Sequence, residues 1–153
     1  MATRAIQLLK KKKVPFEVIK YEHREKGAEF AAGATGFALK KTVKTLVIKL
    51  DHKNYCLALL PGDRRLNLKS LAKVFKVKRP AMADTAAAQR LTGYLVGGIS
   101  PFGTKQQFEV VADASIIEFD EVLINAGQRG TMLKMSPRDI VALLKCRLAE
   151  IGN

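Results

Sequence analysis

A lysine stands within an apolar strand pattern in the first half of the chain. The stretch 43–50 has the sequence VKTLVIKL, and alternation places Lys44 on the same face as Leu46, Ile48 and Leu50. An ammonium group on a core face needs a partner or an anionic ligand, because burying an unpaired charge is costly. The alternative is a lysine at the strand end whose head reaches water along its own stem. Lys44 is therefore the first candidate for holding an anionic ligand.

Two glycine-containing loops are candidates for contacts with an oxyanion or a phosphate. The stretch 97–103, GGISPFG, can present backbone N–H groups to such an oxygen, or it can be a structural turn made rigid by proline. It is not a P-loop, because Thr104 and Lys105 stand in the reverse of the order that this motif requires. The stretch 125–130, NAGQRG, places Arg129 between glycines, where it can hold a phosphate or a carbonyl, or belong to a surface turn.

The usual catalytic sets are absent from this sequence. His52 falls in a predicted hairpin turn and His23 in a charged stretch, so both are expected to be solvated. Cys56 and Cys146 have no CxxC spacing, which is typical of free thiols in a reducing cytosol. No zinc deaminase signature and no GxSxG nucleophile elbow is present. A hydrolase built on this chain would depend on positioning and backbone dipoles.

The elements that would position these loops mix helices with hairpins. A first predicted helix covers 5–14 and is capped by Thr3. A second helix, ending in a turn, is predicted within 28–39, and a short one follows Asn67 as its cap. Another helix runs from Asp84 to near Gly93. The last helix begins at Ser136-Pro137 with Asp139 in its first turn. Its predicted apolar face consists of Ile140, Leu143, Leu144 and Leu148. Predicted strands cover 16–21, 43–50, 55–60, 107–111, 122–125 and 132–135, with a hairpin turn at 51–54.

This order favours one α/β domain over residues 1–153. Strand, helix and strand do not alternate regularly, so a doubly wound parallel sheet is not expected. The pattern instead predicts a curved, mostly antiparallel mixed sheet flanked by helices.

Charge is the strongest compositional signal. The net charge is +13, and it is uneven: residues 1–90 hold 21 Lys and Arg against 7 Asp and Glu, whereas residues 91–153 hold 6 against 7. Such a basic half attracts phosphate backbones, and Lys69, Lys73 and Lys76 fall on one face of a predicted helix as candidate contacts with nucleic acid. No membrane span, no amphipathic membrane segment and no secretory signal is indicated, so a cytoplasmic protein is expected.

Several segments resemble those of one known family, the YbaK/EbsC family. They are TGYLVGGISPFG at 92–103, KTLV at 44–47, MADTAAAQR at 82–90, AGQRG at 126–130 and KYEH at 20–23, in matching order across almost the whole chain. Members of this family are similar to the editing insertion of prolyl-tRNA synthetase, as free-standing domains. The resemblance implies an α/β domain with a central, partly barrelled mixed sheet.

The resemblance also implies an activity. Family members hydrolyse cysteine from Cys-tRNA(Pro), and less selectively from Cys-tRNA(Cys), because cysteine is close to proline in size and a binding pocket alone discriminates poorly. The implied chemistry is substrate-assisted: the cysteine thiol attacks its own ester carbonyl and leaves as a cyclic thiolactone. No metal and no organic cofactor is implied.

Site residues follow from the resemblance by position. The catalytic set is Lys44, Gly98, Ile99 and Ser100, with the loop N–H groups on the oxyanion. The substrate-binding set is Tyr21, Phe30, Thr45, Pro101, Gly127, Arg129 and Gly130. The family carries an acidic residue just after the second glycine loop, whereas Thr131 to Lys134 contain none, so no carboxylate is expected to act there.

Other functions remain open at this stage. A deacylase for alanine or another small residue would have the same motifs, and a non-catalytic tRNA-binding module would have the same charge. A prolyl-tRNA synthetase partner is compatible with each of these, and the oligomeric state is left undetermined by the sequence.

Overall fold

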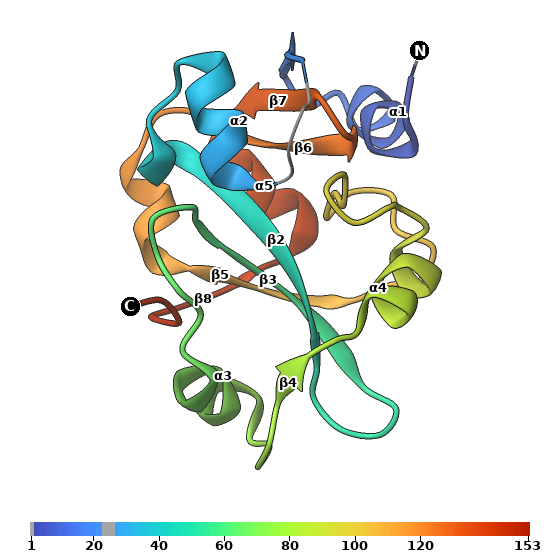
Figure 1. Ribbon diagram of the computed structural model, residues 1–153, viewed down its shortest axis with the longest axis vertical. Helices are drawn as coiled ribbons and strands as arrows, with labels where there is room; N and C mark the ends of the chain where they lie inside the picture. The colour runs from blue at the N-terminus through green and yellow to red at the C-terminus, as the bar shows by residue number, and fades with distance from the viewer. Residues whose placement is uncertain (1, 23–26) are drawn as a thin grey trace.

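A computed structural model describes residues 2–22 and 27–153. Helices flank a central mixed sheet (Figure 1). The strands are β1 (Glu17–Lys20), β2 (Thr42–Lys49), β3 (Tyr55–Pro61), β4 (Ala81–Met82), β5 (Glu109–Asp113), β6 (Val122–Gln128), β7 (Thr131–Met135) and β8 (Arg147–Ala149). The helices are α1 (Arg4–Lys11), α2 (Ala28–Thr35), α3 (Leu68–Phe75), α4 (Thr85–Thr92) and α5 (Pro137–Leu144), with 3-10 turns η1 (Leu39–Lys41) and η2 (Ala114–Glu118).

The sheet has the order β1-β7-β6-β2-β3-β5-β8, and β4 pairs with a short part of β2. Among the described strands, β1–β7, β6–β7, β2–β3 and β2–β4 pair antiparallel, whereas β2–β6, β3–β5 and β5–β8 pair parallel. The end strands β1 and β8 do not pair with each other, so the expected mixed sheet is confirmed but it is open rather than closed.

Both faces of the β2–β3 hairpin are packed. Val43 and Val47 lie in a core with α1 and α5, whereas Ile48 and Cys56 lie in a second core with α3. A strand buried on both faces has a nearly continuous apolar sequence rather than a clean alternation. The face that carries Lys44 is therefore one of two core faces of β2.

Helix starts agree with the predicted caps. The side chains of Thr3, Asn67, Asp84 and Ser136 each accept a hydrogen bond from a backbone N–H in the first turn of the helix that follows. These bonds satisfy N–H groups that have no partner inside the helix.

The predicted helix ends differ from the structure in three places. The first helix, expected over 5–14, ends at Lys11, because Lys13 adopts φ 58 and closes α1 with a left-handed residue. The segment 28–39, expected as a helix that ends in a turn, is helical only to Thr35. The turn begins at Gly36, which adopts φ +76 and closes α2 with a left-handed residue. The last helix also stops early: Leu148 lies in β8 and is 42% exposed, so it is not part of the apolar face of α5. The short strands β4 and β8, at the margins of the sheet, were not predicted from the sequence.

Candidate active site

A mainly apolar pocket of the described chain runs along one edge of β2. It is a pocket of about 390 Å³, a volume in the range of small-ligand sites. Six successive residues of β2, from Thr42 to Val47, line it. Successive strand residues point to opposite faces, so a pocket that touches all six must lie along the strand edge.

The other walls come from several elements. They are Gly27, Ala28 and Ala31 at α2, Met82 and Ala83 at β4, Thr85 and Ala88 on α4, Val96, Gly97 and Ile99 from the glycine loop region, and Tyr21, Asn125 and Met132. The lining is mainly apolar, and no carboxylate is among the described lining residues.

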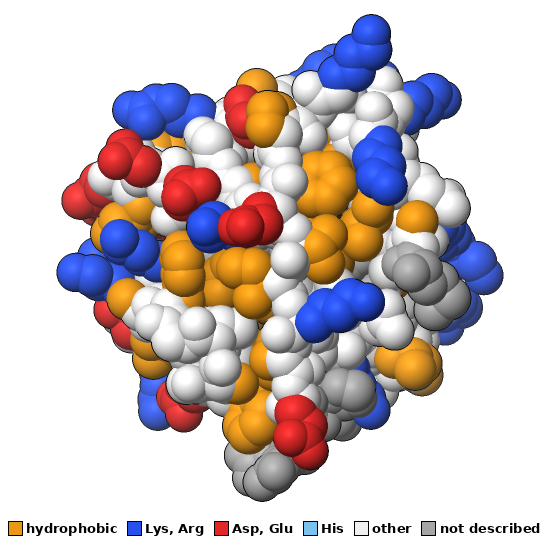
Figure 2. All heavy atoms as spheres, turned by 90° about the horizontal axis from the view of Figure 1, so that it is seen from above, with side chains coloured by type: hydrophobic (Ala, Val, Ile, Leu, Met, Phe, Trp, Pro, Cys, Tyr) orange, Lys and Arg blue, Asp and Glu red, His pale blue; other side chains and the backbone are white. Residues whose placement is uncertain are grey.

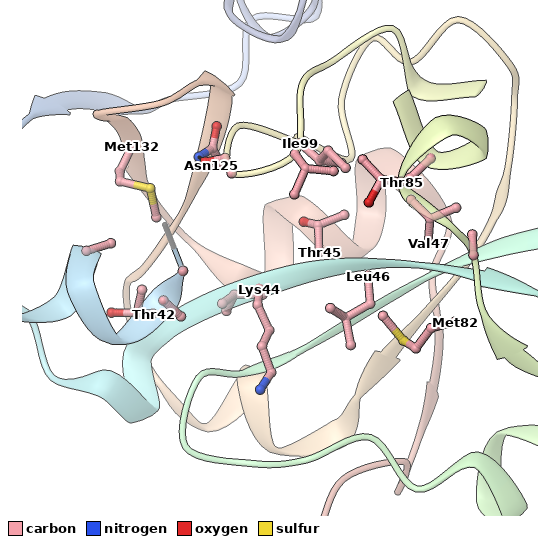
Figure 3. A pocket seen from close by; sticks show the side chains of 18 of the residues that line it. Thr42, Lys44, Thr45, Leu46, Val47, Met82, Thr85, Ile99, Asn125 and Met132 are labelled. Atoms are coloured by element: carbon pink, nitrogen blue, oxygen red, sulfur yellow. Dashed lines mark hydrogen bonds between the residues drawn. The ribbon is translucent and has the colours of Figure 1, made fainter. Parts of the chain in front are cut away.

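Lys44 lines this pocket and is partly buried. Burial lowers the pKa of its ammonium, and Arg65 lowers it further, whereas the carboxylates of Glu29 and Asp63 act in the opposite direction. Figure 3 shows Lys44 and Leu46 leaving β2 on the side opposite to Ile99 and Asn125. The Lys44 head therefore lies across the strand from the glycine loop, at the pocket margin.

Thr45 leaves β2 on the other side, toward Ile99 and Thr85 (Figure 3). Its hydroxyl oxygen is buried and has no hydrogen-bond partner among the described residues. A buried hydroxyl without a partner is costly and is uncommon in folded proteins. Thr45, predicted to bind substrate, is thus a pocket residue with an unused polar atom.

Tyr21 lines the pocket and Phe30 supports it. The two rings pack with centroids 6.2 Å apart and an interplanar angle of 47°. The Tyr21 N–H donates to the Gly130 carbonyl at 2.9 Å, and burial raises the pKa of its phenol. Phe30 itself is outside the pocket lining.

The glycine loop, residues 97–103, is held mainly through the carbonyls at its start. The Val96 carbonyl accepts from Arg129 Nε at 2.9 Å and Nη2 at 2.6 Å, and the Gly97 carbonyl accepts from Asn125 Nδ2 at 3.2 Å. The Gly98 N–H donates to the Leu95 carbonyl at 2.8 Å, so this N–H is not free for a substrate oxygen.

Of the predicted loop residues, only Ile99 lines the pocket. Ser100 is fully buried, and its hydroxyl oxygen accepts the Phe102 N–H at 3.2 Å. Gly98, Ser100 and Pro101 are outside the pocket lining, whereas Gly97 is part of it. The N–H groups of Ile99 and Ser100 donate no hydrogen bond to the part of the chain that is described.

The turn between β6 and β7 is the support on which the glycine loop rests. A Cβ on Gly98 would lie 2.9 Å from the backbone nitrogen of Arg129, so only glycine permits this approach. Gly130 in this turn adopts φ +79, and Gly127, in the irregular last part of β6, adopts φ +97. Gly127, Arg129 and Gly130 are outside the pocket lining, and Arg129 holds the Val96 carbonyl.

Several pocket residues were not singled out from the sequence. Asn125 fixes the loop through its amide, and its carbonyl oxygen accepts the Gly127 and Gln128 N–H groups. Asn followed two residues later by Gly is the local signal that was available for this role. Met132 occupies the stretch in which the family carries an acid, and its thioether lines the pocket (Figure 3).

The remaining titratable candidates lie elsewhere. Cys56 is buried and Cys146 partly buried, and burial raises the pKa of each thiol to about 12. His52 is exposed in the hairpin turn, and His23 lies outside the described residues. Within 2–22 and 27–153, no three His, Cys, Asp or Glu side chains are grouped to hold a metal ion, and no helix could cross a membrane.

Lys69, Lys73 and Lys76 are all exposed on or at the end of α3. None of the three forms an ion pair with a described residue. On the face seen in Figure 2, apolar side chains gather toward the middle, and Lys, Arg, Asp and Glu side chains lie among and around them.

Comparison with known proteins agrees with this architecture. Residues 23–143 match the family model described as the aminoacyl-tRNA editing domain. EbsC of Enterococcus faecalis, a candidate Cys-tRNA(Pro)/Cys-tRNA(Cys) deacylase, is 30% identical over 97% of this chain and 92% of its own length. The multifunctional Ser/Thr-tRNA deacylase ProXp-y of Escherichia coli is also 30% identical, over 96% of this chain and 90% of its own.

The fold is shared with solved structures. A candidate trans-editing enzyme for prolyl tRNA synthetase superposes with a TM-score of 0.89 at 23% identity, over 98% of this chain and 95% of that one. The family model matches most of this chain, and two relatives match it almost end to end. This chain therefore belongs to the aminoacyl-tRNA editing domain family.

Proposed function

We propose that this protein is a trans-editing hydrolase that removes cysteine from mischarged Cys-tRNA(Pro), and from Cys-tRNA(Cys) less selectively. The observation that carries the proposal is the pocket at the β2 edge. It is lined by Lys44 and a tethered glycine loop, yet by no histidine, cysteine, serine or carboxylate among the described residues. A site of this kind can orient an ester and stabilise an oxyanion, but its threonine hydroxyls have no histidine or carboxylate beside them in the described lining to activate them as nucleophiles.

The substrate thiol then performs the attack. Its sulfur bonds to the ester carbonyl carbon, the bond from that carbon to the ribose oxygen breaks, and the ribose oxygen takes up a proton. Cysteine leaves as a cyclic thiolactone, which water opens afterwards. The N–H group of Ile99, which lines the pocket and has no described hydrogen-bond partner, donates to the oxyanion. The Lys44 ammonium holds the terminal nucleotide or the carbonyl side of the substrate.

Serine or threonine is the second candidate amino acid. It is favoured by the equal identity to ProXp-y and by the unpartnered Thr45 hydroxyl in the pocket, which can bond a substrate hydroxyl. Deacylation of tRNA(Pro) charged with cysteine, serine, alanine or proline separates these substrates. An absence of hydrolysis with every charged tRNA, together with binding, would indicate a non-catalytic module.

We further propose that the tRNA backbone contacts the basic segment, defined as residues 64–79. This segment holds seven Lys and Arg and no Asp or Glu. It leads directly into β4, whose Met82 lines the pocket. If the phosphates of the tRNA acceptor arm lie along this segment, the aminoacylated 3′ end reaches the β2 edge. A prolyl-tRNA synthetase bound to the same tRNA in the cytoplasm would supply tRNA selection.

Neutralising Lys69, Lys73 and Lys76 to glutamine should weaken tRNA binding and flatten its dependence on salt. Each phosphate contact contributes roughly one unit to the slope of log affinity against log salt, so the slope should fall by about two to three. The matched control is Lys10, Lys11 and Lys12 to glutamine, exposed residues at α1, at the opposite end of the molecule from α3 (Figure 1). Equal slopes for the two variants would contradict a specific role for α3.

Replacing either cysteine with alanine should leave deacylation within about threefold of wild type. Both thiols have a pKa raised by burial to about 12, so neither is a thiolate at neutral pH, and neither lines the pocket. Single-turnover rates of Cys56→Ala and Cys146→Ala, measured with thermal unfolding, test this. A loss of more than tenfold in a variant that unfolds like wild type would assign a thiol to the mechanism.

A further inference from the structure

The outer edge of β2 is open at its centre. On this edge β6 pairs with Thr42 and Val43, and β4 pairs with Ile48 and Lys49. No described strand pairs with the edge between them. The gap is part of the pocket, since Lys44, Thr45 and Leu46 are all lining residues.

The backbone polar groups of Thr45 point into this gap. The Val47 carbonyl accepts the Ala83 N–H on the open edge at 3.0 Å, whereas the Thr42 carbonyl accepts the Gly62 N–H on the β3 side at 2.8 Å. In an extended strand, alternate residues direct their N–H and C=O to the same edge. Thr45 is two residues from Val47, so its N–H and C=O are directed to the edge that no strand occupies.

The unpartnered Thr45 hydroxyl lies beside this free backbone. It is buried without a described partner, and it is on the Ile99 and Thr85 side of β2 (Figure 3). One residue thus presents a backbone donor, a backbone acceptor and an orphan hydroxyl to the same pocket. Leaving such groups unsatisfied is unfavourable, which points to a ligand that satisfies them together.

We propose that the aminoacyl group of the substrate pairs with Thr45 as a single residue of an added antiparallel strand. This rests on the proposed function and names how the amino acid is read. In an antiparallel pair of this type, two opposite residues exchange both backbone hydrogen bonds. The α-ammonium donates to the Thr45 carbonyl. The ester carbonyl accepts the Thr45 N–H, which thereby joins the Ile99 N–H as an oxyanion donor.

The pairing also places the amino-acid side chain. Residues directly opposite in an antiparallel pair project from the same face of the sheet. The substrate side chain therefore lies beside the Thr45 hydroxyl, on the side of Ile99 and Thr85, and away from Lys44. There the orphan oxygen bonds a substrate thiol or hydroxyl, and an alanine or proline side chain leaves it unsatisfied. Thr45 is on this account the residue that selects for a polar side chain.

Binding of stable amide analogues tests the proposal without requiring turnover. The probes are tRNA(Pro) carrying 3′-amide-linked cysteine, serine, alanine or 3-mercaptopropionate, the last of which lacks the α-ammonium. Wild type should bind the seryl probe about tenfold more tightly than the alanyl probe, with the cysteinyl probe between them because a thiol is a weaker donor. Loss of the α-ammonium should weaken binding of the thiol probe by about tenfold.

Thr45→Val should bind the seryl and alanyl probes equally, because the hydroxyl is lost. It should still bind the mercaptopropionyl probe more weakly than the cysteinyl probe, because the backbone groups that pair with the α-ammonium are unchanged. Thr45→Ser should restore the preference. The melting temperature of Thr45→Val should equal or exceed that of wild type, since the lost hydroxyl has no partner in the protein. A retained seryl preference, or equal binding of the two thiol probes, would overturn the proposal. Failure of the proposed function is seen separately, as absent deacylation of ester-linked Cys-tRNA(Pro).

Discussion

Replacing Lys44 with alanine should lower the rate of Cys-tRNA(Pro) deacylation by about 10- to 150-fold. This is the effect of losing a charge-assisted hydrogen bond worth roughly 1.5–3 kcal/mol. The ammonium lies at the margin of the pocket, on the side of β2 opposite to the glycine loop. It is placed to hold a phosphate or carbonyl of the terminal nucleotide while the aminoacyl group occupies the edge.

The fold should tolerate this change. Burial lowers the pKa of Lys44 below its usual 10.5, so the folded state binds its proton less tightly than the unfolded state does. Between the lowered pKa and 10.5 the unfolded chain therefore carries more proton, and stability rises with pH over that window. At neutral pH the charge opposes folding, so Lys44→Ala should melt at or above the wild-type temperature.

The matched control is Lys49→Ala. Lys49 carries the same charge on the same strand but is exposed and outside the pocket lining. Its substitution should leave the rate within about twofold of wild type, as surface changes usually do. Near-wild-type deacylation by Lys44→Ala, measured under single-turnover conditions, would remove Lys44 from the site. Lys44→Arg keeps the charge and should retain part of the rate.

Serine-charged tRNA(Pro) should be cleared at least about a hundredfold more slowly than cysteine-charged tRNA(Pro). Without a positioned general base, attack by a hydroxyl loses roughly 10²–10⁴ in rate, whereas a thiol is partly thiolate at neutral pH. The described lining contains no histidine and no carboxylate that would serve as that base. Orientation at high effective molarity supplies much of the rate for the thiol.

The measurement is a parallel deacylation assay on the two charged tRNAs at equal enzyme concentration. Alanyl-tRNA(Pro) is the control for a side chain that can neither attack nor bond Thr45. Equal clearance of cysteine and serine would contradict the substrate-thiol scheme and would place this chain with ProXp-y in substrate choice. An activated water would then be the nucleophile. Because the Thr45 proposal concerns binding, a preference for seryl analogues in binding is compatible with faster chemistry on cysteine.

Local sequence determined much of this protein. The caps Thr3, Asn67, Asp84 and Ser136 indicated four helix starts, because capping depends on residues within one turn of each other. The β2–β3 hairpin, the mixed sheet and the basic first half followed from alternation and charge. The glycine loop and Lys44 were singled out by residue type and spacing, and both contribute to the pocket.

Tertiary structure alone decided which atoms of those motifs are available. Gly97 and Gly98 are adjacent, yet only Gly97 lines the pocket. The β6–β7 turn packs against Gly98 and leaves no room for a Cβ there. Arg129 was a candidate anion ligand in the sequence, and in the fold its guanidinium is bonded to the Val96 carbonyl. Contacts of this kind join residues about thirty positions apart, which no local pattern specifies.

The open edge of β2 is the clearest case. Residues 43–50 predict a strand, but they do not indicate which neighbours will pair with it or where pairing stops. The register of β6 and β4 along β2 sets the gap at Lys44 to Leu46, and that register is fixed by long connections and by packing on both faces. Backbone groups are the same at every residue, so only the arrangement of strands determines that those of Thr45 remain free for a substrate.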